Sequence, residues 1–363
     1  MKKYIALLLT FLVTVSMVAG CAAPSQPAAQ APAAQEPAAT EAQAAEPAAA
    51  SEPAYVLKIG HDHTTTSPIQ ASAEEFKRLV EENSNGQISV EIYPAQQLGS
   101  SREMIESLQI GTLEAVLLPT AKFGGFDQRL NLADMPFIAD SEKDFLTIFN
   151  GEIGQEAMSG LPSIGITGIA YYPEGFKAIT NNVHPIVTPA DLKGLKIRTM
   201  EAPIIMSMFS AWGANPVPVD FTEVYNSLQQ NVVDGQENPF LSIHDMKFYE
   251  VQKYMTISNH AYLSYFLAAS TSWFDALPAD LQEVVRQAGI DASAFCLVKM
   301  NEANDGYLKT IKDYGVEVYE LSQEERQTFK DACSSVYDDY RDVIGGDLLD
   351  RAVAQAAELS AAQ

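Results

Sequence analysis

Two closely spaced histidines are the first side chains in this sequence that could do chemistry. They stand in the segment Gly60-His61-Asp62-His63, directly after an apolar run. Strand alternation would place His61 and His63 on one face at the carboxyl end of a strand, where they could hold zinc given a third ligand. The remaining histidines are scattered, and their spacing indicates no such ligand. We therefore expect no metal, and expect His61 and His63 to line a cleft, since ligands of open α/β sheets lie at strand ends.

Motifs of the common enzyme classes are missing from the sequence. It contains no GxSxG elbow, no GxxxxGK[ST] loop, no HExxH pair and no EF-hand spacing. No glycine-rich dinucleotide fingerprint follows the first strand. The sequence thus predicts neither catalysis nor a cofactor.

A short basic stretch, residues 191–199 (DLKGLKIRT), carries the most informative cations. Gly194 interrupts a helical segment, and Lys196 and Arg198 then alternate with two apolar residues on a short strand. Arginine suits a carboxylate because its guanidinium donates two parallel hydrogen bonds. From this stretch alone, however, a surface salt bridge is the simpler interpretation of Arg198.

The elements that must position these side chains alternate between strands and helices. The hydrophobic pattern predicts strands near 55–59, 88–92 and 115–118, with helices near 73–80 and 104–108 between them. We expect the first strand to be buried on both faces and interrupted at Gly60. Strand, helix, strand, helix, strand is the signature of a parallel sheet.

The second half of the chain repeats this mixture. We expect strands at 164–170, 195–199 and 316–321, helices at 201–211 and 221–230, a long strand at 261–270 that crosses between lobes, and a long helix from Pro278 to about Tyr307. Ser322 and Glu325 form a capping box for the last helices. Two α/β lobes connected by several crossings account for this order.

Length and charge restrict the function further. The chain has 363 residues, of which 47% are apolar, enough for two lobes. Lys and Arg number 23 against 47 Asp and Glu, giving a formal charge of -24, which excludes nucleic acid as a partner. The three cysteines, Cys21, Cys296 and Cys333, form no metal or disulfide framework, and whether the last two pair is left open.

The first fifty residues predict export and anchoring. Lys2 and Lys3 precede an apolar run too short for a membrane span, so residues 1–20 are read as a signal peptide. The segment Val18-Ala19-Gly20-Cys21 resembles a bacterial lipobox, which implies that the Cys21 thiol is lipidated. Residues 22–53 are almost entirely Ala, Pro, Gln, Glu, Ser and Thr, a composition typical of a disordered tether.

Several blocks in a fixed order resemble the solute-binding proteins of TRAP transporters, the DctP-like family that captures organic acids outside the cell. The resemblance runs from Tyr55 to beyond Tyr319. The blocks are Gly175-Phe176-Lys177 with Thr180-Asn181-Asn182, the LKGLKIR run at 192–198, Asn215-Pro216-Val217-Pro218 leading to Phe221, and Val233 to Pro239, which contains GQEN.

This resemblance implies a periplasmic-binding-protein clamshell in which an acid is held between two lobes. The arginine of LKGLKIR, Arg198, corresponds to the family's carboxylate clamp, and Asn238 of GQEN lies in the same pocket. Phe221 matches an aromatic that packs on the ligand, and Tyr265 matches a position that lines the pocket.

The sequence departs from the family at three places, one of which is His61 to His63, where relatives use a strand-end polar residue. Lys177 replaces a frequent arginine, so a second carboxylate or hydroxyl would be held less directionally. Pro119 stands where some relatives carry a polar ligand-binding residue. Tyr171 and Tyr172 could form a pocket wall.

The sequence therefore predicts a non-enzymatic, lipid-anchored protein on the extracytoplasmic face of the membrane that delivers an organic acid to a TRAP permease. Sugar acids, dicarboxylates and 2-oxo acids all remain open as ligands. Two alternatives remain: an exported zinc hydrolase using His61 and His63, and a sensory binding protein of the same fold. The expected binding residues are Arg198, Asn238, Lys177, Phe221, Tyr265, Tyr172, His63 and His61.

The expected domain boundaries follow from these assignments. Residues 1–20 form the signal peptide, and residues 21–53 the lipidated cysteine and tether. Lobe I comprises 54–174 plus 264–303, and lobe II comprises 175–263 plus 304–363.

Overall fold

A computed structural model describes residues 52–362, and within this part of the chain the strands form two mixed sheets. The predicted signal peptide, Cys21 and nearly all of the tether lie outside the described residues. The first sheet has the order β2 (Ile88–Tyr93), β1 (Tyr55–His61), β3 (Ala115–Pro119), β10 (Tyr262–Ser270), β4 (Ile166–Phe176). The second has the order β11 (Glu317–Glu320), β9 (Tyr254–Ile257), β5 (Ala178–Asn181), β8 (Gly235–Asn238), β6 (Lys196–Thr199), β7 (Asn215–Pro218).

The first sheet begins as the predicted parallel unit. Helices α1 (Pro68–Asn83) and α2 (Ser101–Gln109) connect β1, β2 and β3, which pair in parallel. Strands β10 and β4 then pair antiparallel, over the whole length from Tyr262↔Phe176 to Ser270↔Ile166. The sheet is therefore mixed, with the two longest strands at one side.

Strand β1 differs from its prediction. It continues through Gly60 to His61, and only its second half is buried on both faces. Val56 is 39% exposed and Lys58 is exposed as well, so the first half of the strand is not buried on both faces. The interruption expected at Gly60 is thus wrong.

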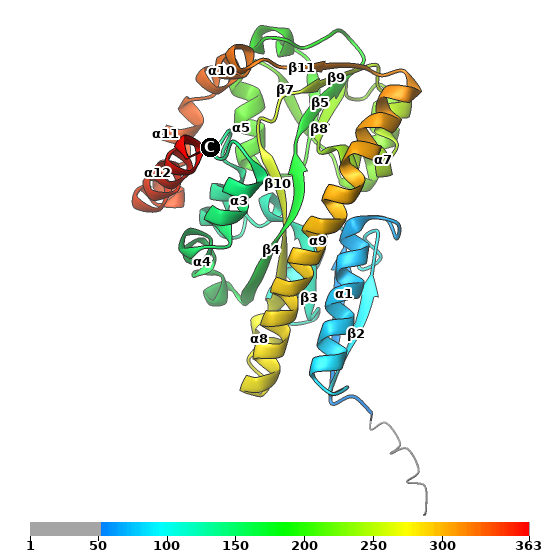
Figure 1. Cartoon of the computed structure of the whole chain (residues 1–363), viewed down its shortest axis with the longest axis vertical. Coiled ribbons are helices and arrows are strands. Elements are labelled where there is room, and N and C mark those ends of the chain that lie inside the picture. The colour runs from blue at the N-terminus through cyan, green and yellow to red at the C-terminus, as the bar shows by residue number, and fades with distance from the viewer. Residues whose placement is uncertain (1–51, 363) are drawn as a thin grey trace, which may run out of the picture. The chain divides into compact units, whose positions relative to one another are not determined.

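The two sheets are joined by chain segments that pass from one to the other. Strand β4 ends at Phe176 and β5 of the second sheet begins two residues later, while β9 leads back into β10. Helix α9 (Ala279–Tyr314) begins beside the first sheet and leads into β11 of the second, as Figure 1 shows. These crossings and the long helix confirm the predicted two-lobed α/β fold.

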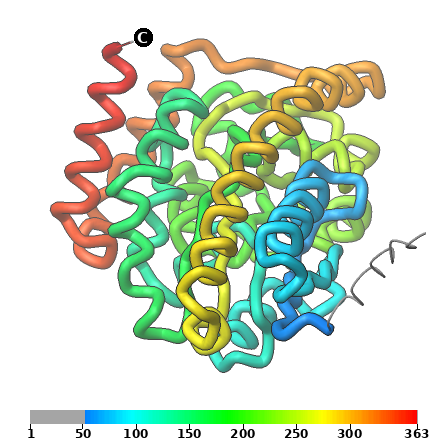
Figure 2. The backbone as a smooth tube through the Cα atoms, turned by 60° about the horizontal axis from the view of Figure 1, so that its bottom comes forward, coloured from blue at the N-terminus to red at the C-terminus, as the bar shows by residue number. Residues whose placement is uncertain are grey.

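Helix α9 has 36 residues, and its small side chains explain its close packing on the first sheet. A Cβ atom at Gly289 would lie 2.6 Å from Ile169 Cγ2 of β4. The helix also lies side by side with α1 (Figure 2). It ends at Gly315, whose φ of 107° is a left-handed conformation that glycine adopts without strain.

The remaining helices cover the sheets. They are α3 (Glu142–Phe149), α4 (Glu152–Met158), α5 (Pro203–Ala211), α6 (Val224–Gln229), α7 (Phe240–Asp245), α8 (Thr271–Phe274), α10 (Gln323–Ala332), α11 (Ser335–Ile344) and α12 (Gly346–Ala361), together with short 3-10 turns that include η1 (Thr120–Lys122), η2 (Gln128–Asp134) and η5 (Phe221–Glu223). The capping box of Ser322 and Glu325 is present at α10, as predicted.

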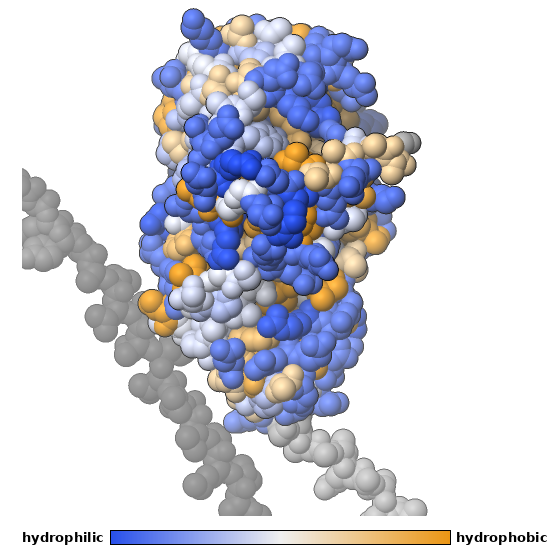
Figure 3. All heavy atoms as spheres, turned by 90° about the vertical axis from the view of Figure 1, so that its left-hand side faces the viewer, coloured by the Kyte–Doolittle hydropathy of each residue, from blue (hydrophilic) through white to orange (hydrophobic). Residues whose placement is uncertain are grey.

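The face shown in Figure 3, the left-hand side of Figure 1, is mostly hydrophilic, with apolar side chains in small separate groups. No helix among residues 52–362 is long and apolar enough to span a membrane. Cys296 and Cys333 are buried free thiols.

Candidate functional site

Strand ends from both sheets converge on a small cavity. Its volume is about 10 Å³, about the room that one water molecule needs. Side chains at or just after the carboxyl ends of β1, β3, β6 and β8 form its wall, the position at which open α/β sheets bind ligands. The lining residues are Asp62, Pro119, Lys122, Arg198, Met200, Phe221, Asn238, Ser242, Leu263 and Tyr265.

Arg198 is the dominant cation of this cavity. Its side chain is buried, with Nε and Nη2 donating to Val219 O at 2.9 and 2.7 Å. Nη1 is buried and donates to no acceptor in the described part of the chain, where Arg198 also forms no ion pair. Burial lowers the pKa of Arg198 to about 10, although Glu237, Asp220 and Asp62 act to raise it. The guanidinium therefore keeps a donor available for an anion in the cavity.

Lys122 supplies a second cation that the sequence did not single out. It is the last residue of η1, just after β3, and it lines the same cavity. Burial lowers the pKa of Lys122, and the nearby charge of Arg198 lowers it further. Within residues 52–362 its ammonium group forms no ion pair. The sequence feature that could have indicated Lys122 is its position shortly after a predicted strand, since the carboxyl ends of strands line ligand clefts.

Asp62 and Tyr265 form one hydrogen-bonded pair in the wall. The Tyr265 hydroxyl donates to Asp62 Oδ1 at 2.8 Å, from the middle of β10 to the residue after β1. Burial raises the pKa of Asp62, while the charge of His63, this hydrogen bond and Lys122 oppose that rise. Asp62 was not among the residues expected to bind ligand.

Asn238 is oriented by a chain of amides and a hydroxyl on the second sheet. Its Nδ2 donates to Gln236 Oε1, Gln236 Nε2 donates to Thr180 Oγ1, and Thr180 Oγ1 donates to Gln252 Oε1. Gln252 Nε2 in turn donates to Val251 O. Because every link has a fixed donor and acceptor, the Asn238 amide cannot turn over without breaking the chain.

The two histidines at the end of β1 face different neighbours. His61 Nε2 lies 2.8 Å from Gln70 Oε1, and burial lowers the pKa of His61 to about 4. His63 contacts the rings of Phe221 and Tyr265, with centroids 5.5 and 5.3 Å away.

A carboxylate sets the charge of His63. Its Nε2 lies 3.6 Å from Glu174 Oε2. Burial acts to lower the pKa of His63, but Glu174 raises it above its usual value. The described residues contain no group of three His, Cys, Asp or Glu side chains placed to hold a metal, so nothing there supports the zinc hydrolase.

Lys177 and Tyr172 are buried but lie outside the lining of the cavity. Lys177 Nζ is 2.9 Å from Glu237 Oε2, and His260 Nε2 is 3.5 Å from the same oxygen. Burial alone would raise the pKa of Glu237, but Lys177 and His260 lower it. Tyr172 pairs with Tyr265 in the β4–β10 register. The structure thus brings together Arg198, Asn238, Phe221 and Tyr265 around the cavity, with His63 behind the two aromatic rings.

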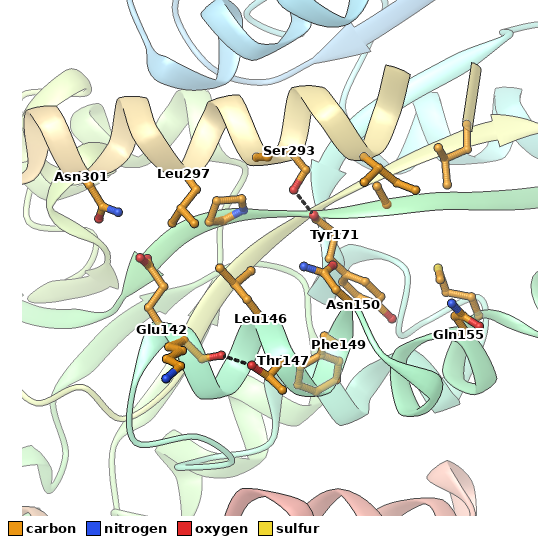
Figure 4. Close-up of a pocket in the computed structure, with 17 residues that line it drawn as sticks. Glu142, Leu146, Thr147, Phe149, Asn150, Gln155, Tyr171, Ser293, Leu297 and Asn301 are labelled. Carbon is orange, nitrogen blue, oxygen red and sulfur yellow. Dashed lines mark hydrogen bonds between the residues drawn. The ribbon is translucent and has the colours of Figure 1, made fainter. Parts of the chain in front are cut away.

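A larger cavity of about 690 Å³ lies elsewhere, between α3, α4, β4 and α9 (Figure 4). Its wall is mostly apolar, with Leu146, Phe149 and Leu297 among its residues. Ser293 on α9 donates to Tyr171 O at 2.6 Å beside it. The only cation in its lining, Lys143, is exposed. A buried anion would find no buried cation there, so the smaller cavity is the better candidate site.

Comparison with known proteins gives consistent matches over most of the chain. Residues 59–342 match the model of a family described as bacterial extracellular solute-binding protein, family 7 (DctP). The C4-dicarboxylate-binding periplasmic protein DctP of Rhodobacter capsulatus is 34% identical over 305 residues, covering 84% of this chain and 91% of that protein. The 2,3-diketo-L-gulonate-binding periplasmic protein YiaO of Escherichia coli is 30% identical, covering 77% and 84%.

Solved structures show the same similarity. The sugar acid binding protein DctPAm of Advenella mimigardefordensis, in complex with galactonate, matches with a TM-score of 0.80 and 33% identity over 85% of this chain and 99% of that chain. A TRAP periplasmic solute-binding protein of Sulfurospirillum deleyianum with bound succinate matches with a TM-score of 0.77 and 31% identity, covering 83% and 98%.

Proposed function

The chain belongs to family 7 of the bacterial extracellular solute-binding proteins, the DctP family, and from this premise we propose how it captures its ligand. It is a binding component of a TRAP transporter and not an enzyme. One relative with a solved structure holds succinate and another holds β-D-galacturonate, so the ligand class is a small carboxylic acid. Delivery to a membrane permease follows from membership of this family.

The buried guanidinium of Arg198 is the observation that carries the proposal. Its Nη1 group has no protein acceptor among the described residues, and no carboxylate lies within ion-pair distance. A buried charge without a partner is costly, and a ligand carboxylate would supply both the counter-charge and the acceptors. We assign Arg198 as the carboxylate clamp, with Asn238 beside it and Phe221 and Tyr265 packing on the remainder.

Residues beyond the lining support these contacts. Lys177 neutralises Glu237, next to Asn238 on β8, and thereby fixes the strand that carries the amide. His63 packs against the rings of both Phe221 and Tyr265. Tyr172 of β4 lies opposite Tyr265 in the pairing of β4 with β10.

Binding couples to closure because the cavity wall comes from both sheets. Asp62 and Lys122 follow strands of the first sheet, whereas Arg198 and Asn238 belong to the second. A cavity of about 10 Å³ is too small to admit a carboxylic acid, so the ligand enters a more open arrangement. A ligand that contacts both sheets then shifts the population toward an arrangement closed around the ligand, in which the cavity is larger than it is here. We place the moving lobes at 54–174 plus 264–303 and at 175–263 plus 304–363.

Export and anchoring complete the proposal. Family membership places the folded part outside the cytoplasm. The lipobox-like segment ending at Cys21 supports a lipid anchor, with residues 22–53 as the tether. Cells fed a labelled fatty acid should incorporate the label into the wild-type chain, whereas Cys21→Ser should lose the label and be released from the membrane. Equal labelling of both would refute the anchor.

Thermal unfolding of the full chain against a panel of organic acids tests the binding function. An acid present at a hundredfold excess over its dissociation constant should stabilise the protein by about 2.7 kcal/mol. Arg198→Ala should weaken binding about thirtyfold or more, since truncating one partner of a buried charge pair costs about 2 to 5 kcal/mol. Arg286→Ala, on the exposed side of α9, is the matched control and should bind normally. Stabilisation by no acid at all, or equal binding by Arg198→Ala, would contradict the proposal.

A further inference from the structure

The polar groups around the small cavity present more hydrogen-bond acceptors than a carboxylate ligand can use. Tyr265 already donates its hydroxyl hydrogen to Asp62, and Ser242 donates its own to Glu174 Oε1 at 2.6 Å. Toward a ligand, these two hydroxyl oxygens can therefore only accept. The second carboxylate oxygen of Asp62 accepts no hydrogen bond within residues 52–362, and neither does Asn238 Oδ1.

The fixed orientation of the Asn238 side chain keeps one of these acceptors in place. Its Nδ2 points to Gln236 because the amide and hydroxyl chain behind it permits only one direction. Asn238 Oδ1 is thus kept as an acceptor. Four acceptor atoms thus belong to side chains that line the cavity, on Asp62, Tyr265, Ser242 and Asn238, and the donors there without a protein acceptor in the described part of the chain are on Arg198 and Lys122.

The charge of the lining points in the same direction. Lys122 and Arg198 contribute two positive charges and Asp62 one negative charge, so the wall carries a net charge of +1. One ligand carboxylate balances this charge. A ligand with two carboxylates would leave an excess negative charge buried beside Asp62, which is unfavourable in a closed, dry site.

We infer that the ligand is a hydroxylated monocarboxylic acid of the sugar-acid class, and that Asp62 is the residue that selects it. Its carboxylate lies against Arg198 and Lys122, and its hydroxyl groups donate to Asp62 and to the acceptors around it. An unsubstituted dicarboxylate carries no donor at neutral pH and would leave these acceptors unpaired. A site built to bind hydroxyl groups discriminates strongly against an analogue that lacks them. This inference rests on the proposed function.

The first test compares three ligand types on the unmodified full chain by isothermal titration calorimetry. These are a panel of four- to six-carbon aldonates and uronates, succinate as a dianion, and hexanoate as a monoanion without hydroxyl groups. We expect at least one sugar acid to bind tenfold or more tighter than both succinate and hexanoate. Succinate or hexanoate binding as tightly as the best sugar acid would overturn the inference while leaving carboxylate binding intact.

Asp62→Asn separates the role of this residue from that of the clamp. Its amide keeps the shape but loses the charge and one acceptor, so sugar-acid affinity should fall tenfold or more, while succinate affinity should stay the same or rise. Asp305→Asn, exposed on α9, is the matched control and should change neither. An equal loss for both ligand classes in Asp62→Asn would overturn the selection by Asp62. Binding of no carboxylic acid to the unmodified chain would instead defeat the proposed function itself.

Discussion

Replacing Asp134 by asparagine should change how the stability of this protein depends on pH. Asp134 ends η2 and is 1% exposed, and neither of its carboxyl oxygens has a hydrogen-bond partner in the described part of the chain. Burial raises its pKa to about 7, with Lys177 acting to lower it and Glu237 to raise it. Asparagine has nearly the same shape and no titratable proton.

The sign and size of the effect follow from linkage. In the unfolded chain an aspartate has a pKa of about 3.9, so between pH 4 and pH 7 the native state holds a proton that the unfolded state releases. Wild-type stability therefore receives a contribution that declines as pH rises through this window and is flat above it. Since one pKa unit corresponds to about 1.36 kcal/mol, the decline amounts to about 4 kcal/mol.

Urea unfolding of wild type and Asp134→Asn at half-unit steps from pH 4 to pH 8 measures this contribution. The quantity to plot is the difference between the two free energies of unfolding, which should rise with pH by about 4 kcal/mol in favour of the variant. The opposite trend from His61, whose pKa is lowered to about 4 by burial, is common to both proteins and cancels. Asp305→Asn should give a flat difference. A flat difference for Asp134→Asn as well would refute the reasoning.

Three further predictions concern the stability of the second sheet and of α10, and urea unfolding tests each of them. Lys177→Met should destabilise the protein by about 3 to 5 kcal/mol because it leaves Glu237 buried without its cation. Adding Glu237→Leu should restore part of the lost stability. No recovery in the double variant would argue against the ion pair. Gly235→Ala should cost about 1 to 3 kcal/mol, since its new Cβ would lie 2.1 Å from a backbone oxygen of β5. The control Gly306→Ala, in open space on α9, should stabilise the protein by about 1 kcal/mol. Equal effects of the two substitutions would contradict the steric clash at Gly235. Ser322→Ala should cost about 1 kcal/mol by removing the helix cap of α10, and an unchanged stability would show that the cap is replaceable.

The histidine pair shows where a sequence pattern stops being informative. Alternation predicts that His61 and His63 share a face, but β1 ends at His61 and the chain then bends. Beyond the strand the period of two no longer applies. His61 consequently meets Gln70, whereas His63 meets Glu174 and two aromatic rings.

Lys122 and Lys177 illustrate the same limit for charges. The Gly175-Phe176-Lys177 block drew attention to Lys177, yet this lysine is paired with Glu237 of β8. Lys122 stood in no motif and lines the cavity. A single cation in a sequence carries no information about which buried carboxylate it meets, because that partner lies some sixty residues away for Lys177.

The sequence alone determined the α/β class, the long helix α9, the crossing strand β10 and the family, because local periodicity and the order of blocks are properties of neighbouring residues. Through the family resemblance it also predicted Arg198, Asn238, Phe221 and Tyr265 as binding residues, and these four line the small cavity. Only the tertiary structure decided that Asp62 and Lys122 join them. Asp62 follows β1 and Lys122 follows β3. The parallel pairing of β1 with β3 brings the carboxyl ends of these two strands together. Long-range pairing of this kind is an outcome of packing, which no single stretch of sequence encodes.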